Sequence, residues 1–546
     1  MPITPTPSSP AAATAAAPIL NSEGLTRLSA TALAGHIARG EITAAEAVEA
    51  HIRRIETINP RLNAVVWEVF PAARASARNA DATAREGAPL GALHGVPFTM
   101  KDSIDLAGTP STFGLPARAS HRAPSDNPMV ARMRAAGAIP LAKTNVSQLL
   151  MYFESDNPLF GRTVNPWNPD RTCGGSSGGE AALIAAGASP IGLGTDIGGS
   201  LRVPAAFCGI ASLKPTSGRM PDPGRFSMPV GQTAIASQVG VMARHVEDVA
   251  LGLGILNDGG GGPETENPDG RPPMPLGDFR SVDISRLRVA FYTDDGTFAA
   301  APAARRAVLE AVESLRRRGA EVAAWTPPDT FLGLELLGAI FFADRGELMR
   351  DMLGKGRKSP QMASFLAVAG MPRPLVRLLA AALRGMGQKG LADGLRIFGH
   401  RDTAHYWKLV EAQADYRRLF KQALDRDAGG PFDLILCPPS ALPAFTHGAS
   451  KDLVTAGSYA PLYNLLGYPA GVAPVTRVRE VEEVGRKPSR DRLEALARKV
   501  EQGSAGLPMG VQVVARPWRE HVALAAMAAI EEDARARPDF PVCPLN

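Results

Sequence analysis

Gly174-Gly-Ser-Ser-Gly-Gly-Glu180 and Gly194-Thr-Asp-Ile-Gly-Gly-Ser200-Leu-Arg202 are the most informative segments of this 546-residue chain. Glycine and serine are much denser over residues 169–218 than in an ordinary alternation of helices and strands. Such density indicates that the backbone has a specific task, because glycine permits tight turns and close approach. A flexible linker or an anion-binding nest would also be rich in glycine. The apolar segment 181–187 follows at once and argues against a linker.

Ser200 is a candidate nucleophile, because it directly follows Ile197-Gly198-Gly199. At such a position the backbone can aim several N–H groups at one point, which is the geometry of an oxyanion hole. A hydroxyl held there can attack a carbonyl carbon. The simpler interpretation is a turn with a capping serine, which these residues commonly form.

The segment around Ser176 also matches the G-x-S-x-G nucleophile elbow of α/β-hydrolases. An elbow needs a strand directly before it. Residues 165–173 contain two prolines and do not form a strand easily. The match is therefore interpreted as spurious.

Lys101 ends an apolar stretch over residues 93–100 that is predicted to form a strand. A lysine in this position is usually a surface residue whose charged end reaches water. If it is buried, it can act as a neutral base, because desolvation disfavours the charged ammonium. Ser–Lys pairs replace Ser–His pairs in some hydrolases.

Taken together, these segments resemble the amidase signature family. The matching pattern is long and extends over nearly the whole chain beyond residue 24: residues 142–146, 174–179, 194–205, 208–210, 213–218, 463–471 and 507–512. Chance agreement over a pattern of this length is negligible. The resemblance implies one large α/β domain, in which helices cover both faces of a mixed, twisted central β-sheet.

The resemblance also implies a catalytic triad of serine, serine and lysine. Ser200 corresponds to the nucleophile that forms the acyl-enzyme, and Lys101 to the base. Ser176 corresponds to the middle serine, which follows a cis peptide bond from Gly175 and relays a proton. The remaining implied site residues are the oxyanion-hole N–H groups of Ile197, Gly198, Gly199 and Ser200, and the supporting Ser177. The family implies neither a metal nor an organic cofactor.

Within the family, the chain resembles the fatty acid amide hydrolase branch through residues 153–161, 165–167 and Glu180. Leu150 matches a position that lines the acyl channel, and Met151 beside it suits an apolar group. We therefore expect hydrolysis of fatty acid amides or other hydrophobic acyl amides. An aryl-amide, urethane or small-amide hydrolase on the same scaffold stays open. A subunit of a tRNA-dependent transamidation complex is a weaker alternative.

Composition narrows the function classes further. The 59 basic residues are balanced by 54 acidic ones, giving a net charge of +5, so no concentrated basic surface for nucleic acid is expected. The four cysteines are far apart, which argues against a disulfide framework or a zinc site and favours a cytoplasmic protein. No apolar run approaches the roughly 18 residues of a membrane-spanning helix. The sequence is compatible with a homodimer.

The expected organisation is a disordered tail over residues 1–24, rich in Pro, Ala, Thr and Ser, and one domain over residues 25–546. A strand–helix–strand unit over residues 287–325 predicts a parallel part of the sheet. Residues from about 330 to 425 are expected to form a helical, cap-like insertion.

Residues 374–398 alternate apolar and basic side chains, as a helix pair on a bilayer surface does. The apolar positions are Leu375, Leu378, Leu379, Leu383, Met386, Leu391, Leu395, Ile397 and Phe398, and the basic ones are Arg377, Arg384, Lys389 and Arg396. The segment resembles in position the hydrophobic cap with which fatty acid amide hydrolases dock on membranes. A helical hairpin packed on the core fits the pattern equally well.

Overall fold

The computed structural model describes residues 21–221, 232–258, 274–398 and 402–543. The expected tail over residues 1–24 lies mostly outside these ranges. Helix α1 begins at Ser22, so ordered structure starts before the expected boundary at residue 25. Residues 257–275, whose composition rich in Gly and Pro predicts a surface loop or linker, also lie mostly outside the described ranges.

A mixed sheet runs through the described part of the chain in the order β1-β3-β2-β6-β8-β7-β12-β13-β11-β9-β10. Its strands are β1 (Val65–Glu68), β2 (Pro97–Lys101), β3 (Ile139–Thr144), β6 (Ile191–Asp196), β7 (Ala211–Lys214), β8 (Gln238–Ala243), β9 (Arg288–Phe291), β10 (Glu321–Ala324), β11 (Leu434–Cys437), β12 (Ala470–Arg477) and β13 (Pro508–Ala515). The two groups β3-β2-β6 and β11-β9-β10 are parallel, and the pairs between them are antiparallel. A separate hairpin joins β4 (Asp156–Asn157) to β5 (Gly161–Arg162).

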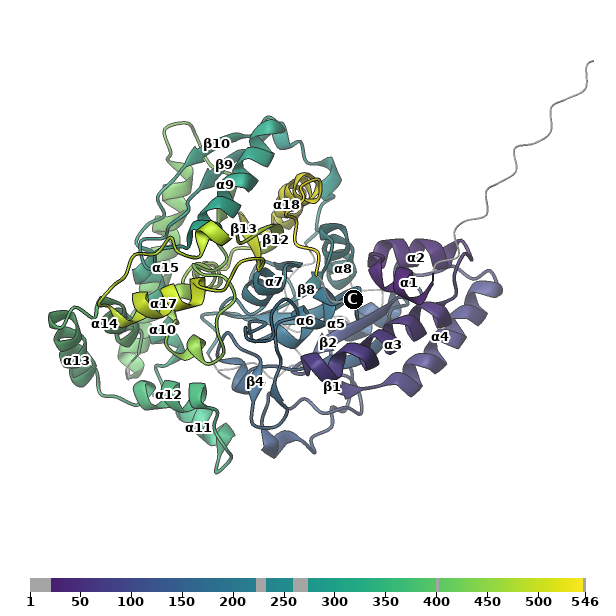
Figure 1. Cartoon of the computed structure of the whole chain (residues 1–546), viewed down its shortest axis with the longest axis horizontal. Coiled ribbons are helices and arrows are strands. Elements are labelled where there is room, and N and C mark those ends of the chain that lie inside the picture. Colours follow the sequence, from purple (N-terminus) through teal and green to yellow (C-terminus); the bar gives the residue numbers. More distant parts are fainter. Residues whose placement is uncertain (1–20, 222–231, 259–273, 399–401, 544–546) are drawn as a thin grey trace, which may run out of the picture.

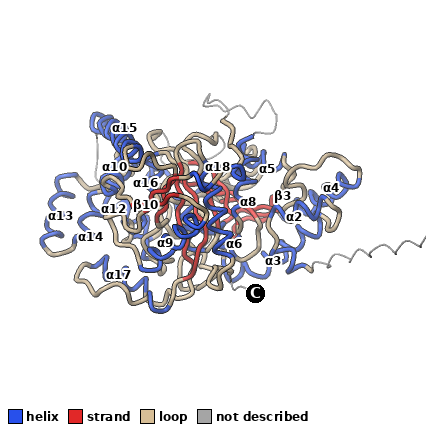
Figure 2. The backbone as a smooth tube through the Cα atoms, turned by 90° about the horizontal axis from the view of Figure 1, so that it is seen from above, coloured by secondary structure: helices blue, strands red, loops and turns tan. Residues whose placement is uncertain are grey.

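Helices cover both faces of this sheet, as expected (Figure 2). Alternate residues of a strand point to opposite faces, so neighbouring positions on β8 identify the two layers. A Cβ on Gly240 would lie 2.5 Å from Leu201, beside α7 (Arg202–Cys208), whereas Val241 contacts α8 (Val246–Asp258). Helix α6 (Gly178–Ala185) packs beside α7, and α18 (Glu520–Arg535) packs beside α8.

Local sequence signals explain several of these elements. Thr43 and Glu46 form a capping box at the start of α3 (Ala44–Leu62). The predicted strand–helix–strand unit is β9, α9 (Pro302–Arg317) and β10, and its two strands are parallel. The prediction of this unit is confirmed.

The expected insertion consists of α10 (Thr330–Phe341), α11 (Glu347–Leu353), α12 (Pro360–Ala369), α13 (Arg373–Gly385), α14 (Lys389–Arg396) and α15 (Thr403–Asp425). Helices α11 to α14 lie at one end of the molecule (Figure 1). Among the described residues, no single helix is long and apolar enough to cross a membrane. Helices α12 and α13 reach that length and composition together, but they meet at a bend of 110°.

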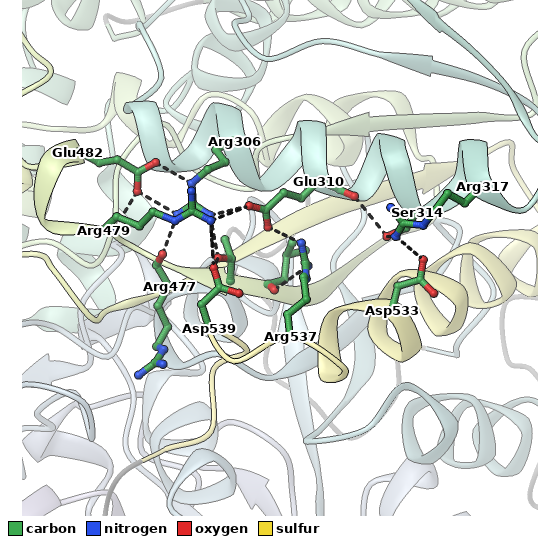
Figure 3. Close-up of polar contacts among 12 residues, drawn as sticks. Arg306, Glu310, Ser314, Arg317, Arg477, Arg479, Glu482, Asp533, Arg537 and Asp539 are labelled. Atoms are coloured by element: carbon green, nitrogen blue, oxygen red, sulfur yellow. Dashed lines mark hydrogen bonds and ion pairs between the residues drawn. The ribbon is translucent and has the colours of Figure 1, made fainter.

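A network of ion pairs joins three parts of the chain that are distant in sequence (Figure 3). Arg306 on α9 binds Glu482, in the loop after β12, at 2.7 Å and Glu310 at the same distance. Arg537, which follows α18, binds the other oxygen of Glu310 at 2.6 Å. Because the charges share partners, the network fixes the loop and the C-terminal segment against α9.

Candidate active site

Lys101 is fully buried at the end of β2, so the surface interpretation of this lysine is excluded. Strand β2 lies between β3 and β6, and all three are parallel. The Lys101 Nζ donates to Ser176 Oγ at 2.7 Å and to Thr195 Oγ1 at 2.8 Å. The structure therefore brings Lys101 and Ser176 together. Thr195, at the corresponding end of β6, was missed by the sequence analysis.

Ser176 and Ser177 occupy the turn that leads into α6. The peptide bond between Gly175 and Ser176 is cis, as the resemblance implied. A Cβ on Gly175 would lie 2.5 Å from the carbonyl oxygen of Tyr152, so this position has no room for a side chain. The Ser177 N–H donates to the Ser200 carbonyl oxygen at 3.2 Å, and Ser177 Oγ donates to the Thr195 carbonyl oxygen at 3.3 Å. The turn is thereby fixed to the segment that carries Ser200.

The residues that directly precede this turn do not form the strand that a nucleophile elbow requires. Residues 165–173 form a loop with two isolated bridges, at Arg171 and Thr172. The G-x-S-x-G match is therefore spurious, as the sequence indicated.

Ser200 lies in the turn between β6 and α7 and is 7% exposed. The Asp196 carboxylate fixes this turn, because Oδ1 accepts from the Gly199 N–H at 2.7 Å and Oδ2 from the Leu201 N–H at 3.2 Å. The Gly199 N–H, expected in the oxyanion hole, donates to Asp196 in this structure, so its oxyanion role stays a prediction. Ile197, Gly198 and Ser200 stay candidate donors.

A fully buried ion pair between Arg202 and Asp196 stabilises the Ser200 turn. Arg202 Nε donates to Asp196 Oδ2 at 2.9 Å, and its other nitrogens bind Gln512 Oε1 at 2.7 Å and Asn464 Oδ1 at 2.5 Å. Burial alone would raise the pKa of Asp196, but the Arg202 charge outweighs it and holds this pKa well below its usual range. Asp196 is therefore ionised. Two charged residues inside a glycine-rich signature are the signal that could have identified this pair.

Glu180 is also fully buried, on α6 against the strands that carry Lys101. Its carboxyl group accepts from the hydroxyl groups of Thr99 on β2 and Thr144 on β3. A Cβ on Gly192 would overlap Glu180 Oε1, so glycine at this point of β6 provides the space. Burial raises the pKa of Glu180 to about 8. At neutral pH this carboxyl group is therefore mostly uncharged and ties α6 to the sheet.

A largely apolar cavity begins at Ser200 and extends between the core and the cap. Its lining includes Leu150, Met151, Ile197, Gly198 and Ser200, which the resemblance places at the substrate site, and it does not include Lys101 or Ser176. The residues that the sequence analysis missed come mainly from the cap: Leu334, Leu337, Gly338, Phe341, Phe342 and Phe365, with Tyr152, Phe153, Ser450, Val454 and Pro461 from the core. Ile397 and Phe398, which belong to the segment expected either to dock on lipid or to pack on the core, line this cavity.

No side chains suited to a metal ion gather in groups of three or more in the described parts of the chain.

Comparison with known proteins identifies the chain's relatives. A sequence profile of the family described as Amidase matches residues 46–524. The chain is 34% identical to fatty acid amide hydrolase 1 of Caenorhabditis elegans, over 91% of this chain and 87% of the relative. It is 32% identical to indoleacetamide hydrolase of Bradyrhizobium diazoefficiens, over 93% and 86%. A solved structure of a fatty acid amide hydrolase superposes with a TM-score of 0.78 at 27% identity, over 94% of this chain and 86% of that one.

The family profile covers most of the chain, and the curated relatives match over nearly their whole length. The chain belongs to the amidase signature family and is an amide hydrolase.

Proposed function

We propose that this chain hydrolyses hydrophobic acyl amides through an acyl-enzyme on Ser200, with Ser176 as proton relay and Lys101 as base. The observation that carries the proposal is the placement of these groups. A buried lysine amine contacts Ser176 Oγ, and Ser200 stands where the apolar cavity meets the Asp196-supported turn. A serine hydroxyl needs such a base, because it is a weak nucleophile at neutral pH.

In the proposed first step, Ser200 Oγ bonds to the substrate carbonyl carbon. Its proton passes to Ser176, whose own proton passes to the neutral amine of Lys101. The N–H groups of Ile197, Gly198 and Ser200 stabilise the oxyanion. When the C–N bond breaks, the leaving nitrogen takes a proton back through Ser176. Water then attacks the ester, again giving its proton to this relay, and releases the carboxylic acid and free Ser200.

The lining of the cavity favours an apolar acyl group. Aromatic side chains from α10, α12 and the end of α14 surround the space beyond Ser200: Phe341, Phe342, Phe365 and Phe398. Phe398 packs against Phe342 with ring centroids 4.7 Å apart and against Phe365 at 5.9 Å. Burying methylene groups of a substrate against apolar side chains is energetically favourable. The relatives of this chain also include fatty acid amide hydrolases.

A substrate panel tests this specificity. Three buried methylenes contribute about 2.4 kcal/mol, so oleoyl amide should exceed acetamide about 60-fold or more in kcat/KM. Leu337→Ser should reduce this preference, because Leu337 lines the cavity. The matched control is Leu332→Ser on the same helix, where the side chain is 39% exposed and lies outside the cavity. Equal rates on both amides would contradict the proposed acyl specificity.

A second candidate is an aryl-amide or small-amide hydrolase. The similarity to indoleacetamide hydrolase and the five phenylalanines of the cavity favour it, because aromatic rings pack well against one another. Anilides and carbamates belong in the same panel for this reason. Hydrolysis of any of these amides by the purified chain would also argue against an obligate transamidation subunit.

We propose in addition that α13 and α14 contact a lipid surface. On this pair, Leu378 and Met386 are 67% and 65% exposed, and Leu375 and Leu379 are also exposed. Arg377 and Lys389 are exposed among them. Arg384 and Arg396 contribute less, since they form ion pairs with Asp393 and Glu335. Four exposed apolar side chains beside two cations suit an anionic bilayer.

Vesicle sedimentation tests this proposal. The double change Leu378→Ser and Met386→Ser should release the protein from phosphatidylserine vesicles, and salt should weaken wild-type binding, because exposed charges are screened over about 10 Å at 0.1 M. The control is Leu309→Ser with Val481→Ser, two residues that are 46% and 78% exposed on α9 and the loop after β12. Binding that both double variants retain would contradict lipid contact through α13.

A further inference from the structure

The cavity-lining loop and the cap are joined by a buried group of polar side chains. Gln148 begins a short 3₁₀ helix, Gln148–Leu150, which precedes the cavity-lining Met151. Its carboxamide makes two hydrogen bonds to the segment before α12: Nε2 donates to the Arg357 carbonyl oxygen at 2.9 Å, and Oε1 accepts from the Ser359 N–H at 2.8 Å. The Gln148 carboxamide therefore bonds to the cap backbone with one donor and one acceptor, as the backbone of an adjacent β-strand would.

Tyr152 completes the same group from the other end of the loop. Its hydroxyl donates to the Asp156 carbonyl oxygen at 2.7 Å and accepts from the Gln148 N–H at 3.2 Å. It also lies 2.8 Å from Ser359 Oγ, which leaves the Ser359 hydroxyl as the donor. Ser359 is the N-cap of α12, where its Oγ accepts from the Met362 N–H at 3.2 Å. All three side chains are buried, and each polar atom of the Tyr152 and Ser359 hydroxyl groups is used.

Both parts that this group joins line the cavity. On the core side, Leu149 and Leu150 have positive φ values of 54° and 62°, a left-handed conformation that residues with a Cβ seldom adopt. On the cap side, α12 carries Phe365, which stacks on Phe342 at 6.2 Å. A loop in a disfavoured conformation persists only where its surroundings fix it. The hydrogen bonds of Gln148 and Tyr152 are part of what fixes it.

We infer that Gln148, Tyr152 and Ser359 form a latch that positions α12 and the 149–151 loop against each other, and thereby sets the selectivity of the cavity for long acyl groups. The inference rests on the proposed hydrophobic-acyl specificity. Gln148 and Ser359 are positioning residues, because the cavity is lined by their neighbours Leu150, Met151 and Phe365, whereas Tyr152 also lines the cavity itself. The Gln148 carboxamide bonds to the cap segment, whereas the Tyr152 carbonyl oxygen lies against Gly175, beside Ser176, so Gln148 is the position to change.

Gln148→Leu tests the latch, because leucine fills similar space and removes both hydrogen bonds to the cap. We expect kcat/KM for oleoyl amide to fall about 10- to 100-fold, mainly through KM, as positioning losses of this size produce. The rate on acetamide should change by less than about threefold, since the reacting groups are untouched. Tyr152→Phe removes only one hydroxyl group and should have a smaller effect in the same direction.

Gln361→Leu is the matched control. Gln361 is a buried glutamine in the first turn of α12, and its Oε1 has no hydrogen-bond partner among the described residues. It should leave both substrates unaffected. The latch has no role in selectivity if Gln148→Leu and Gln361→Leu have the same kinetic parameters. The same conclusion follows if Gln148→Leu lowers kcat/KM equally for oleoyl amide and acetamide.

Hydrogen exchange provides a readout that does not depend on the substrate. Backbone amides of residues 360–369 should exchange faster in Gln148→Leu than in wild type and in Gln361→Leu, because loss of the latch permits local opening of α12. If the enzyme shows no preference for long acyl amides but this exchange increases, the proposed function is wrong and the latch stands. If the preference is present but exchange is unchanged, the latch is wrong.

Discussion

Replacing Ser200 by alanine should abolish amide hydrolysis, with a fall in kcat of about 10⁵- to 10⁶-fold, as expected when a serine nucleophile is removed. The change deletes one oxygen at the mouth of the cavity and leaves the Asp196–Arg202 pair intact. The variant should therefore fold normally, with an unchanged thermal unfolding midpoint. Turnover of a chromogenic amide, corrected for the uncatalysed rate, measures the loss.

A fluorophosphonate probe gives an independent result for the same residue. It should label Ser200 in the wild type and should not label Ser200→Ala, because the probe reacts with the activated hydroxyl group. Ser176 and Ser200 lie on one tryptic peptide, residues 172–202, so cleavage after Glu180 or fragment-ion sequencing is needed to distinguish them. Labelling at Ser176 would contradict the assignment and favour the nucleophile elbow, despite the loop that precedes it.

The sequence predicted the core of the site well, because its geometry follows from short, local patterns. Glycines precede both Ser176 and Ser200. A side chain on Gly175 would meet backbone atoms, and a side chain on Gly192 would meet the buried Glu180 carboxyl group. Lys101 ends the predicted strand, and its neighbours β3 and β6 bury it completely. A short sequence motif can predict such positions, because they depend on residues that are only a few places apart in the chain.

The cavity could not be predicted in the same way. Phe342, Phe365 and Phe398 are spread over three separate segments of the insertion and meet only through packing. The apolar pattern of residues 374–398 fitted lipid contact and core packing equally well, and the structure buries Phe398, which is only 7% exposed. An amphipathic pattern identifies which side of a helix is apolar, and it cannot distinguish lipid from a neighbouring helix.

Long-range polar contacts were equally inaccessible to sequence reasoning. Gln148 forms hydrogen bonds with Arg357 and Ser359, which are 209 and 211 positions further along the chain. Neither of these two residues belongs to a recognisable motif. The Gly199 N–H illustrates the reverse case. Its place in the motif implied an oxyanion donor, but Asp196, three residues before it, accepts that hydrogen bond. A backbone donor has one hydrogen, and the local carboxylate takes it.

Lys101→Met should lower kcat by about 10²- to 10⁴-fold, the usual range for loss of general acid–base assistance. Methionine is similar in length and apolar, so it removes the hydrogen bonds to Ser176 and Thr195 without leaving a large cavity. Wild-type activity should rise toward alkaline pH, because only an uncharged amine can accept the proton from Ser176. The residual activity of Lys101→Met should lack that rise.

Lys143→Met is the matched control for this prediction. Lys143 is a second fully buried lysine, on the adjacent strand β3, and its Nζ donates to the Pro110 carbonyl oxygen and to Ser111 Oγ rather than to a catalytic serine. Burial lowers the pKa of Lys143 to about 8. Its replacement should alter the free energy of unfolding but should leave kcat per folded molecule and the alkaline rise in place. If both variants lose activity equally, or if Lys101→Met keeps the wild-type pH profile, burial of a lysine in the sheet would explain the effect, and Lys101 would not be the base.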